Sequence, residues 1–337
     1  MTEPSWRPPG SQYLAQIREF GPPMLRMRYR SGVVIDAQGF PQWDLLARAT
    51  VQLPDADTAL TYDELRVLDV LTANEVMMRT GDPLWEFTRH DHAALTPPGW
   101  TWAHLRGARA VALVPVEAYN AFRHPGGLSV LSFNRRRYGI ALGQHRSVPR
   151  ESVSRLTAEL VERMEEKFGF RFPDGYREFL ADTNGACPTT PGIHPDFGFV
   201  TDLPFFGVNR PDPHQDVIYA NGWFGDRLTS DFFAVGYVQG GLLTVRVRGT
   251  DLGSVWYWDN DDPRDDDRHD AEYVCQHLLY RVADSFGDFW AQLSAAPDRM
   301  VARVREAATG GAARSVFTEQ MGASLSQDRR PPQDGPR

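Results

Sequence analysis

The sequence predicts an α+β protein of two domains, and three observations lead to this fold class. A length of 337 residues favours two domains over one. The first half contains two strands and a short helix in succession around residues 100–127, whereas the second half has two helices followed by alternating strands. Charge also divides the chain: residues 1–150 carry 17 Arg against 14 acidic residues, a net of +3, and residues 151–300 carry 13 basic against 26 acidic residues, a net of −13.

Turn residues and charge suggest where the domains meet. The segment NRRRYGIALGQHRSVPRES, with three consecutive Arg, two Gly and a Pro, is typical of a linker. We therefore expect one domain at residues 1–133, an Arg-rich linker at 134–152 and a second domain at 153–300. Residues 301–337 are expected to hold the end of a helix and a tail, disordered from Thr309 onward because it lacks a burial pattern.

Composition excludes several classes of protein. The N-terminus has neither the basic nor the apolar region of a signal peptide, and no apolar run is long enough to span a membrane. Cys187 and Cys275 lie far apart without metal-ligand spacing, as expected of reduced thiols in a cytoplasmic protein. The acidic second half repels phosphate backbones, so we expect a basic protein partner, no nucleic acid partner and no membrane contact.

The second half begins with an amphipathic helix, SVSRLTAELVERMEEKFGF, for which Ser152 or Ser154 can act as the N-cap. Pro173 opens a second helix over DGYREFLADTN, and Gly185 stops it. FFAVGYV, LLTVRVRG and GSVWYWDND then alternate with a period of two, which predicts an antiparallel meander. DSFGDFWAQL is the closing helix.

These motifs, in this order, resemble the SUKH superfamily of bacterial immunity proteins and cell-wall-synthesis regulators. The resemblance is carried by FPDGYREFLADTNGA, AVGYVQGG, GSVWYWDND and DSFGDFWAQL, and it covers about 140 residues, from Val153 to Leu293. It implies a SUKH-like antiparallel sheet with flanking helices, no catalytic site, and in many members the binding and silencing of a toxin. One departure is an irregular excursion at 196–230, which is a natural place for partner-specific contacts.

The segment WYWDNDDPRDDDRHD contains seven Asp in fifteen residues. It lacks the spacing and the terminal Glu of a calcium loop, so it is either a solvated acidic turn or a contact for a basic partner. An exposed aromatic side chain beside acidic residues would suit an interaction hot spot. The candidate partner-binding residues are therefore Trp256, Trp258, Asp259, Asp261, Asp262, Asp265, Asp266 and Asp267.

In the first half, TWAHL and AVALVP predict two strands joined by a turn at GAR, and Pro115 precedes a helix over VEAYNAFRH that ends at PGG. Strand, strand and short helix is the order of the ββα-metal fold, in which a divalent cation stabilises the scissile phosphate and a His activates water. The segment resembles the HNH superfamily, in particular the WHH group of toxin nucleases, and the likeness spans roughly residues 24–128. Those proteins run Trp-His-His, Leu-Val-Pro, a His four residues after that Pro, and His-Thr-Gly-Gly.

The residues that match this pattern are Trp102, His104, Leu113, Val114, Pro115, His124, Gly126 and Gly127. Ala103 stands at the first His of the pair and Tyr119 at the helix His, so two imidazoles are absent, and Pro125 replaces the Thr. Loss of half the ligands should severely weaken metal binding. If the domain were active, the resemblance would make His104 the base and His124 a metal ligand. His90 and His92 would then be possible replacement ligands. If the domain is inactive, His104 and His124 are inherited structural histidines.

We therefore expect a degenerate nuclease-like domain joined to a SUKH-like domain, with no cofactor and no enzymatic activity. The expected function is that of an immunity-type protein that neutralises a basic nuclease toxin by contact in the bacterial cytoplasm. Two alternatives stay open: an active, metal-dependent HNH-type endonuclease with reorganised ligands, and a scaffold of the cell-wall-regulator type. Whether the two domains pack against each other is also left open.

Overall fold

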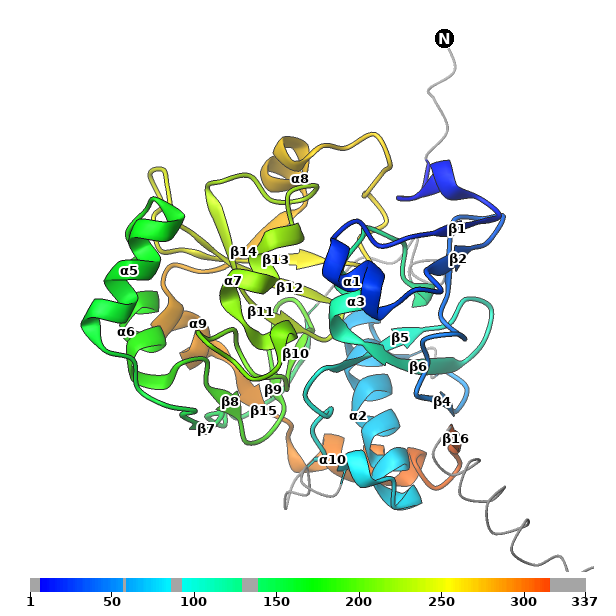
Figure 1. Ribbon diagram of the computed structural model, residues 1–337. Helices are drawn as coiled ribbons and strands as arrows, with labels where there is room; N and C mark the ends of the chain where they lie inside the picture. Colours follow the sequence, from blue (N-terminus) through cyan, green and yellow to red (C-terminus); the bar gives the residue numbers. More distant parts are fainter. Residues whose placement is uncertain (1–6, 57–58, 86–92, 129–138, 316–337) are drawn as a thin grey trace, which may run out of the picture.

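The computed structural model describes residues 7–56, 59–85, 93–128 and 139–315 (Figure 1). Its elements form a mixed α+β structure with several antiparallel sheets. Among the described residues, no helix combines the length and apolar composition needed to cross a bilayer. His90 and His92 fall outside the described residues.

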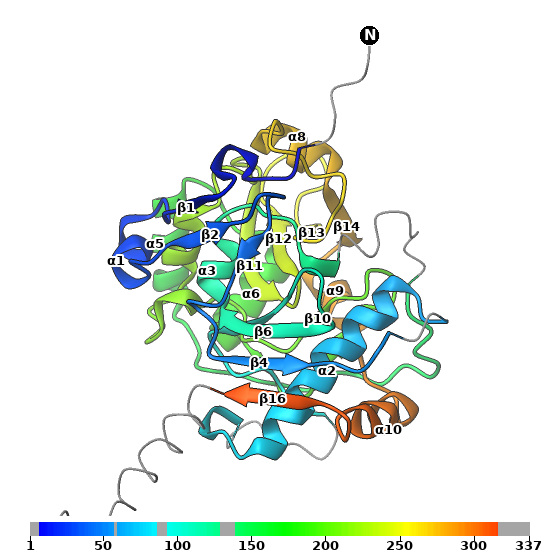
Figure 2. The same cartoon turned by 90° about the vertical axis from the view of Figure 1, so that its right-hand side faces the viewer.

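The main sheet of the first half has the strand order β16-β4-β6-β5 (Figure 2). Its strands are β4 (Ala49–Gln52), β5 (Trp100–His104), β6 (Ala110–Pro115) and β16 (Ala312–Ser315). The hairpin β5–β6 runs directly into the short helix α3 (Val116–Asn120), so the predicted order of strand, strand and helix is present.

Strand β16 comes from the far end of the chain and pairs antiparallel with β4, with Ala313 opposite Val51. It follows α10 (Asp298–Ala307), which packs on α2 of the first half (Figure 2). The expected disorder from Thr309 onward is therefore wrong for residues 312–315. Four residues without a burial pattern become a strand because an open sheet edge supplies their hydrogen bonds. The rest of the expected tail, 316–337, lies outside the described residues.

Helix α2 (Tyr62–Thr80) crosses this sheet and is buried along most of its length. Thr61 and Glu64 form a capping box at its start, and Gly81 ends it in the left-handed conformation, φ 75°. Because α2 is covered by the sheet, by α10 and by the second half, its polar residues are buried as well. This burial on all sides explains why the segment lacks a clear apolar stripe.

A smaller sheet, β1-β2-β3, precedes these elements and carries α1 (Pro23–Arg28). Its strands are β1 (Gln16–Arg18), β2 (Val33–Ile35) and β3 (Pro41–Gln42).

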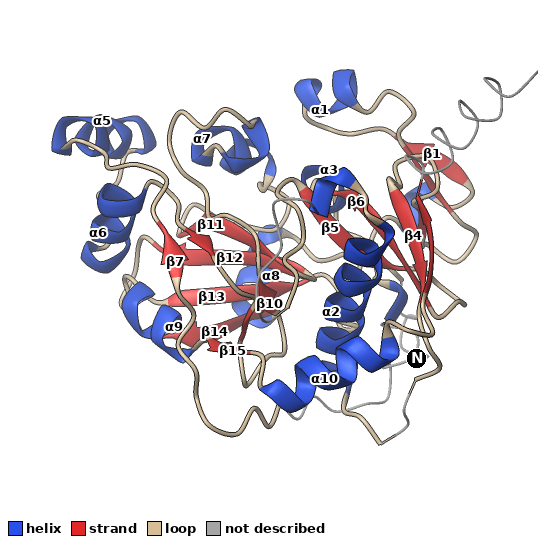
Figure 3. Cartoon of the chain, turned by 90° about the horizontal axis from the view of Figure 1, so that it is seen from below, coloured by secondary structure: helices blue, strands red, loops and turns tan. Residues whose placement is uncertain are grey.

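The second half is built on the antiparallel sheet β11-β12-β13-β14. Its strands are β11 (Phe232–Val238), β12 (Gly241–Arg246), β13 (Val255–Asp259) and β14 (Leu279–Ala283). The predicted meander is present, and α8 (Ala271–His277) connects its last two strands. Helices α5 (Ala158–Phe168), α6 (Asp174–Thr183) and α9 (Phe286–Gln292) lie at the side of this sheet away from the first half (Figure 3).

Two predicted helices differ clearly from the observed ones. Helix α3 ends at Asn120, whereas the sequence predicted a helix through His124. Helix α5 begins at Ala158 rather than near Ser154, because the side chain of Thr157 is the N-cap and accepts a hydrogen bond from the amide of Leu160. The amides of Val153 and Leu156 instead donate to carbonyls of Thr183 and Ala181, at the end of α6. The segment before the helix is thus held in an extended conformation.

The excursion at 196–230 contains a short strand, β10 (Val200–Thr201), and the helix α7 (Val217–Ala220). Single turns of 3-10 helix lie on either side of α7, at Pro213–Gln215 and Asn221–Trp223. Strand β10 belongs to the three-stranded sheet β10-β9-β15, with β9 (Gly192–Ile193) and β15 (Ser294–Ala295).

The two halves share one core. Val114, Tyr119 and Phe122 of the first half belong to the same cluster of buried residues as Tyr257 and Trp258 of the second. Of the expected linker, residues 139–152 are described and are anchored: Ile140, Leu142 and Val148 are buried there, and β7 (Arg150–Glu151) pairs with β8 (Cys187–Pro188). The question of packing between the halves is therefore answered: they are in close contact.

Candidate functional site

The candidate site is the buried region between the hairpin β5–β6, helix α3 and the Pro-Gly-Gly segment that follows it. His104 ends β5, Tyr119 lies on α3 and His124 precedes the Pro-Gly-Gly segment. Ala103 is buried in the strand at 1% exposure, so a methyl group stands where the resemblance places the first imidazole.

His104 is engaged in an ion-pair network. Its Nε2 lies 3.2 Å from Oδ2 of Asp69, a residue of α2. Arg109, from the end of the hairpin turn, donates two hydrogen bonds to the same carboxylate, each 2.8 Å long. Burial alone would raise the pKa of Asp69, but the hydrogen bonds from His104 and Arg109 outweigh it and the pKa is lowered. The carboxylate is therefore charged, and His104 is held by it at the rim of the sheet.

His124 is enclosed by aromatic rings. Trp43, Tyr119 and Phe122 have ring centroids 5.3, 4.6 and 5.4 Å from the imidazole. Its Nδ1 lies 3.0 Å from the carbonyl oxygen of Phe122, whereas its Nε2 is buried with no hydrogen-bond partner among the described residues. Burial lowers the pKa of His124 to about 4, so the ring is neutral near pH 7.

Tyr119 does not replace the missing imidazole. It is buried at 3% exposure, and burial, with the nearby Asp261 carboxylate, raises the pKa of its phenol well above the ordinary value. A neutral phenol is a poor ligand for a divalent cation.

The residues present do not fit the divalent cation of the ββα-metal fold. Ala103 offers no donor, Tyr119 offers a neutral oxygen, and His104 is bound to Asp69. The free Nε2 of His124 is the one imidazole nitrogen left facing the site among the described residues. Consistent with this, no group of three or more His, Cys, Asp or Glu side chains with metal-binding geometry occurs within the described ranges.

The space beside His124 is instead taken by an aspartate of the second half. Asp261, from the acidic segment after β13, is buried at 3% exposure, and its Oδ1 has no hydrogen-bond partner among the described residues. This oxygen occupies the position that a β-carbon on Gly126 would take. Asp261 also acts electrostatically on both His124 and Tyr119, which places its carboxylate in the site. Only a glycine at 126 leaves room for it.

Arg123 binds the acidic segment next to this site. Its guanidinium forms a two-point ion pair with the carboxylate of Asp265, through Nε at 3.1 Å and through a second, shorter contact. The same group donates 2.6 Å hydrogen bonds to the carbonyl oxygens of Asp266 and His269. Arg123 and Asp265 are buried at 7% and 5% exposure, so this is a desolvated pair with its donors satisfied.

Arg66 of α2 makes a second contact of the same kind. It is 2% exposed and donates to Asp259 at 3.3 Å, to the carbonyl of Gln239 at 3.4 Å and to the hydroxyl of Tyr257. Gln239 lies in the turn between β11 and β12, and its side-chain oxygen accepts a 3.2 Å hydrogen bond from the amide of Trp102. The turn thus provides a hydrogen-bond acceptor for a backbone amide on the edge strand β5.

The structure places the other predicted partner-binding residues as follows. Asp262 is buried and binds Arg264 and the hydroxyl of Tyr280, while the carboxylate of Asp267 accepts hydrogen bonds from Gly10 and Ser11 of the first half. Asp266 is buried at 3% exposure and pairs with Arg268. Trp258 is a core residue at 1% exposure, and Trp256 is half-buried with its indole bonded to Ser254.

The acidic segment is therefore not a solvated turn. Five of its aspartates are less than 10% exposed: Asp259, Asp261, Asp262, Asp265 and Asp266. The charges that would attract a separate basic partner are largely used within the chain. Arginines of the first half bind Asp259 and Asp265, and arginines of the second half bind Asp262 and Asp266.

Residues that the sequence did not reveal include Asp69, Arg66, Arg123 and Gln239. For Arg66 and Arg123, the signal that could have found them is the opposite net charge of the two halves, which is visible in the sequence; no such signal marks Asp69 or Gln239. The opposite charge predicted a basic contact for the acidic segment but could not show that this contact lies within the chain.

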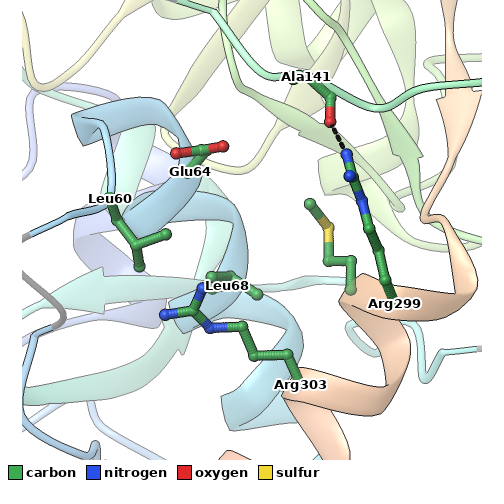
Figure 4. Close-up of a pocket in the computed structure, with 7 residues that line it drawn as sticks. Leu60, Glu64, Leu68, Ala141, Arg299 and Arg303 are labelled. Carbon is green, nitrogen blue, oxygen red and sulfur yellow. Dashed lines mark hydrogen bonds between the residues drawn. The ribbon is translucent and has the colours of Figure 1, made fainter.

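A surface pocket of about 400 Å³ lies apart from this site, between α2 and α10 (Figure 4). Leu60, Glu64 and Leu68 line one side, and Arg299 lines the other and donates a hydrogen bond to the carbonyl of Ala141. It is lined by none of the candidate residues.

Comparison with protein families finds two matches. The SMI1 / KNR4 family (SUKH-1) matches residues 155–292. A nuclease of the HNH/ENDO VII superfamily with conserved WHH matches residues 93–132, which contain the hairpin, α3 and the Pro-Gly-Gly segment. Both suspected resemblances are confirmed, in the suspected order. No curated protein is similar to the chain at a significant level.

Proposed function

We propose that this chain is a non-catalytic binding protein of a bacterial toxin–immunity system. The proposal starts from its two family matches, one to a WHH-type nuclease and one to the SMI1 / KNR4 family (SUKH-1). The protein neutralises a nuclease toxin by protein–protein contact in the cytoplasm. The family to which the second half is similar includes immunity proteins that bind toxins. This similarity is our reason for proposing a toxin as the partner.

The observation that carries the proposal is the position of Asp261. A working ββα-metal site keeps its pocket open for a cation and a phosphate. Here the carboxylate of Asp261 lies against Gly126 beside a neutral His124, so a second-half side chain fills the place that a substrate would need.

Burial of the acidic segment supports a stable arrangement of the two halves. Replacing one member of the buried ion pair Arg123–Asp265 leaves the other charge buried and unpaired. Such a change lowers the free energy of unfolding by roughly 3–5 kcal/mol. The shared core adds to this, because Tyr119 and Phe122 pack in the same cluster as Trp258. The first half therefore serves as a scaffold for the second rather than as an enzyme.

The test is growth protection. The full chain is co-expressed with nuclease toxins encoded beside it, and we expect rescue of growth by at least one pairing. The His104→Ala variant should protect equally well, because binding needs no base. Failure of the wild-type chain to protect against any of them would overturn the proposal and favour a scaffold of the cell-wall-regulator type. Loss of protection in His104→Ala, with folding intact, would favour an active nuclease.

A further inference from the structure

Three loops of the second half meet around a pocket of about 430 Å³. They are the segment 171–176 at the start of α6, the turn 252–253 between β12 and β13, and residues 284–286 at the start of α9. These loops contain the FPDGY, LGS and DSF sequences, which are parts of motifs that carry the family resemblance. The site described above uses none of them.

The inner wall of this three-loop pocket is aromatic and contains an unsatisfied polar atom. Phe172, Tyr176 and Phe286 line it at 1–2% exposure. The hydroxyl of Tyr176 is buried and has no hydrogen-bond partner among the described residues. A buried hydroxyl without a partner is costly in free energy, so a group that enters the pocket and hydrogen-bonds to it would be stabilised.

The rim of the pocket carries two aspartates and one arginine, Arg171. Asp174 and Asp284 line it, and both side chains are 82% exposed. Their ion-pair partners, Arg171 at 3.3 Å and Arg281 at 2.9 Å, are themselves 74% and 46% exposed. Such exposed pairs contribute little to stability, so an incoming cation can replace either arginine at small cost.

Two further features mark this rim as a contact surface. Leu252 also lines the pocket and is 55% exposed, so its apolar side chain is accessible to an incoming group. A neighbouring pocket of about 490 Å³ shares Asp284 and adds Asp196 and Asp288. Aspartates thus line both pockets, with Arg171 and Arg281 among them.

The three-loop pocket also lies on the free side of the molecule. All the residues that line it belong to the second half, and α6 and α9 lie far from α1 and α3 (Figure 1). Unlike the acidic segment at 259–267, its carboxylates are not used by arginines of the first half.

We propose that the three-loop pocket receives an arginine or lysine side chain of a basic protein partner. This inference rests on the proposed function and names the surface that carries it. The aliphatic part of the side chain packs against Leu252 and Phe172, and its charged end is held by Asp174 and Asp284. The aromatic rings attract the cation, and the hydroxyl of Tyr176 accepts a hydrogen bond from it.

The direct test uses N-acetyl-arginine N-methylamide as the probe and the full chain as the receptor. We expect titration to shift the backbone amide NMR signals of Gly175, Gly253 and Ser285, whereas N-acetyl-leucine N-methylamide leaves them in place. In Asp174→Asn/Asp284→Asn the dissociation constant should rise about fivefold or more, since two exposed charges are lost. Asp298→Asn is the matched control, because Asp298 is also exposed and paired with an arginine, Arg146.

Tyr176→Phe separates binding from folding. The hydroxyl has no partner to lose, so thermal stability should be unchanged or higher, while the affinity for the arginine probe falls about threefold or more. Amide shifts that scatter over other surfaces, or equal binding of the leucine probe, would overturn the proposal.

Growth protection then distinguishes the two proposals. If the wild-type chain protects and Asp174→Asn/Asp284→Asn does not, the pocket is part of the partner contact. If both protect equally, the pocket inference is wrong and the proposed function stands. If the wild-type chain never protects, the proposed function fails, and the probe titration alone decides whether the pocket binds a basic side chain.

Discussion

The carboxylate of Asp261 lies against the backbone of Gly126, where any β-carbon would overlap with its Oδ1. The two residues come from opposite halves of the chain. This contact joins the acidic segment to the segment after α3, and it can be tested by substitution.

Gly126→Ala should lower the free energy of unfolding by about 1–3 kcal/mol, because the added methyl group must displace a buried carboxylate. In an Asp261→Gly background the same change should cost less than about 0.5 kcal/mol, since the clash is gone. Gly21→Ala is the control, because a β-carbon there meets no atom within 4 Å. Chemical denaturation of the wild-type chain, the two single variants and the double variant measures the coupling free energy between the two positions. If Gly126→Ala lowers the free energy of unfolding equally in both backgrounds, the contact is contradicted.

Arg123→Ala should destabilise the chain by about 3–5 kcal/mol, because Asp265 is left buried without its ion-pair partner. Arg123→Ala/Asp265→Asn should cost less than the sum of the two single changes. Arg155→Ala, at an exposed position, should change stability by less than about 0.5 kcal/mol. If Arg123→Ala proves as mild as the control, the halves are not held together by this pair.

His124 should make stability depend on pH below neutrality. Burial lowers its pKa to about 4, whereas the unfolded chain keeps the ordinary value near 6.5. As the pH falls from 6.5 to 4, the unfolded state takes up the proton first, so up to about 3 kcal/mol of stability is lost in this window.

His124→Phe should therefore flatten the stability curve between pH 6.5 and 4, as followed by thermal unfolding. Some slope will remain, because burial also lowers the pKa values of His194 and His214. His277→Gln, at an exposed position, should leave the curve unchanged. A wild-type slope that survives intact in His124→Phe would show that the ring is not buried in its neutral form.

Removal of β16 should destabilise the first half although the strand lies at the other end of the sequence. A chain ending at Gly311 lacks the partner of β4, so the edge of that sheet is uncovered next to Val51. We expect a loss of roughly 1–2 kcal/mol relative to a chain ending at Ser315. Identical melting temperatures for the two truncated chains would contradict a structural role for the strand.

Local patterns predicted the elements of this fold better than their assembly. The hairpin at 100–115 and the meander from Phe232 to Asp259 follow from alternation of apolar residues, and Gly185 follows the end of α6 as expected. The pairing of β16 with β4 could not be predicted. These four residues have no strand pattern of their own, and they form a strand only because the rest of the fold places the edge strand β4 beside them.

For the candidate site, sequence reasoning found the residues but not their neighbours. The replacement of two imidazoles by Ala103 and Tyr119 is visible in the sequence, and the structure adds that Asp261 fills the site. The acidic segment was predicted to meet solvent or a basic partner, yet its basic partners are Arg66 and Arg123 of the same chain. Long-range ion pairs of this kind carry no local sequence signal.

The most direct test of the central claim, that the chain acts by binding and not by cleavage, is a plasmid-nicking assay on the purified full chain. Supercoiled DNA is incubated with the protein in Mg²⁺, Mn²⁺ or Zn²⁺, beside a His104→Ala sample. We predict that the DNA stays supercoiled with every metal, because Asp261 occupies the site and two imidazoles are missing. Metal-dependent nicking by the wild-type protein that disappears in His104→Ala would contradict this account.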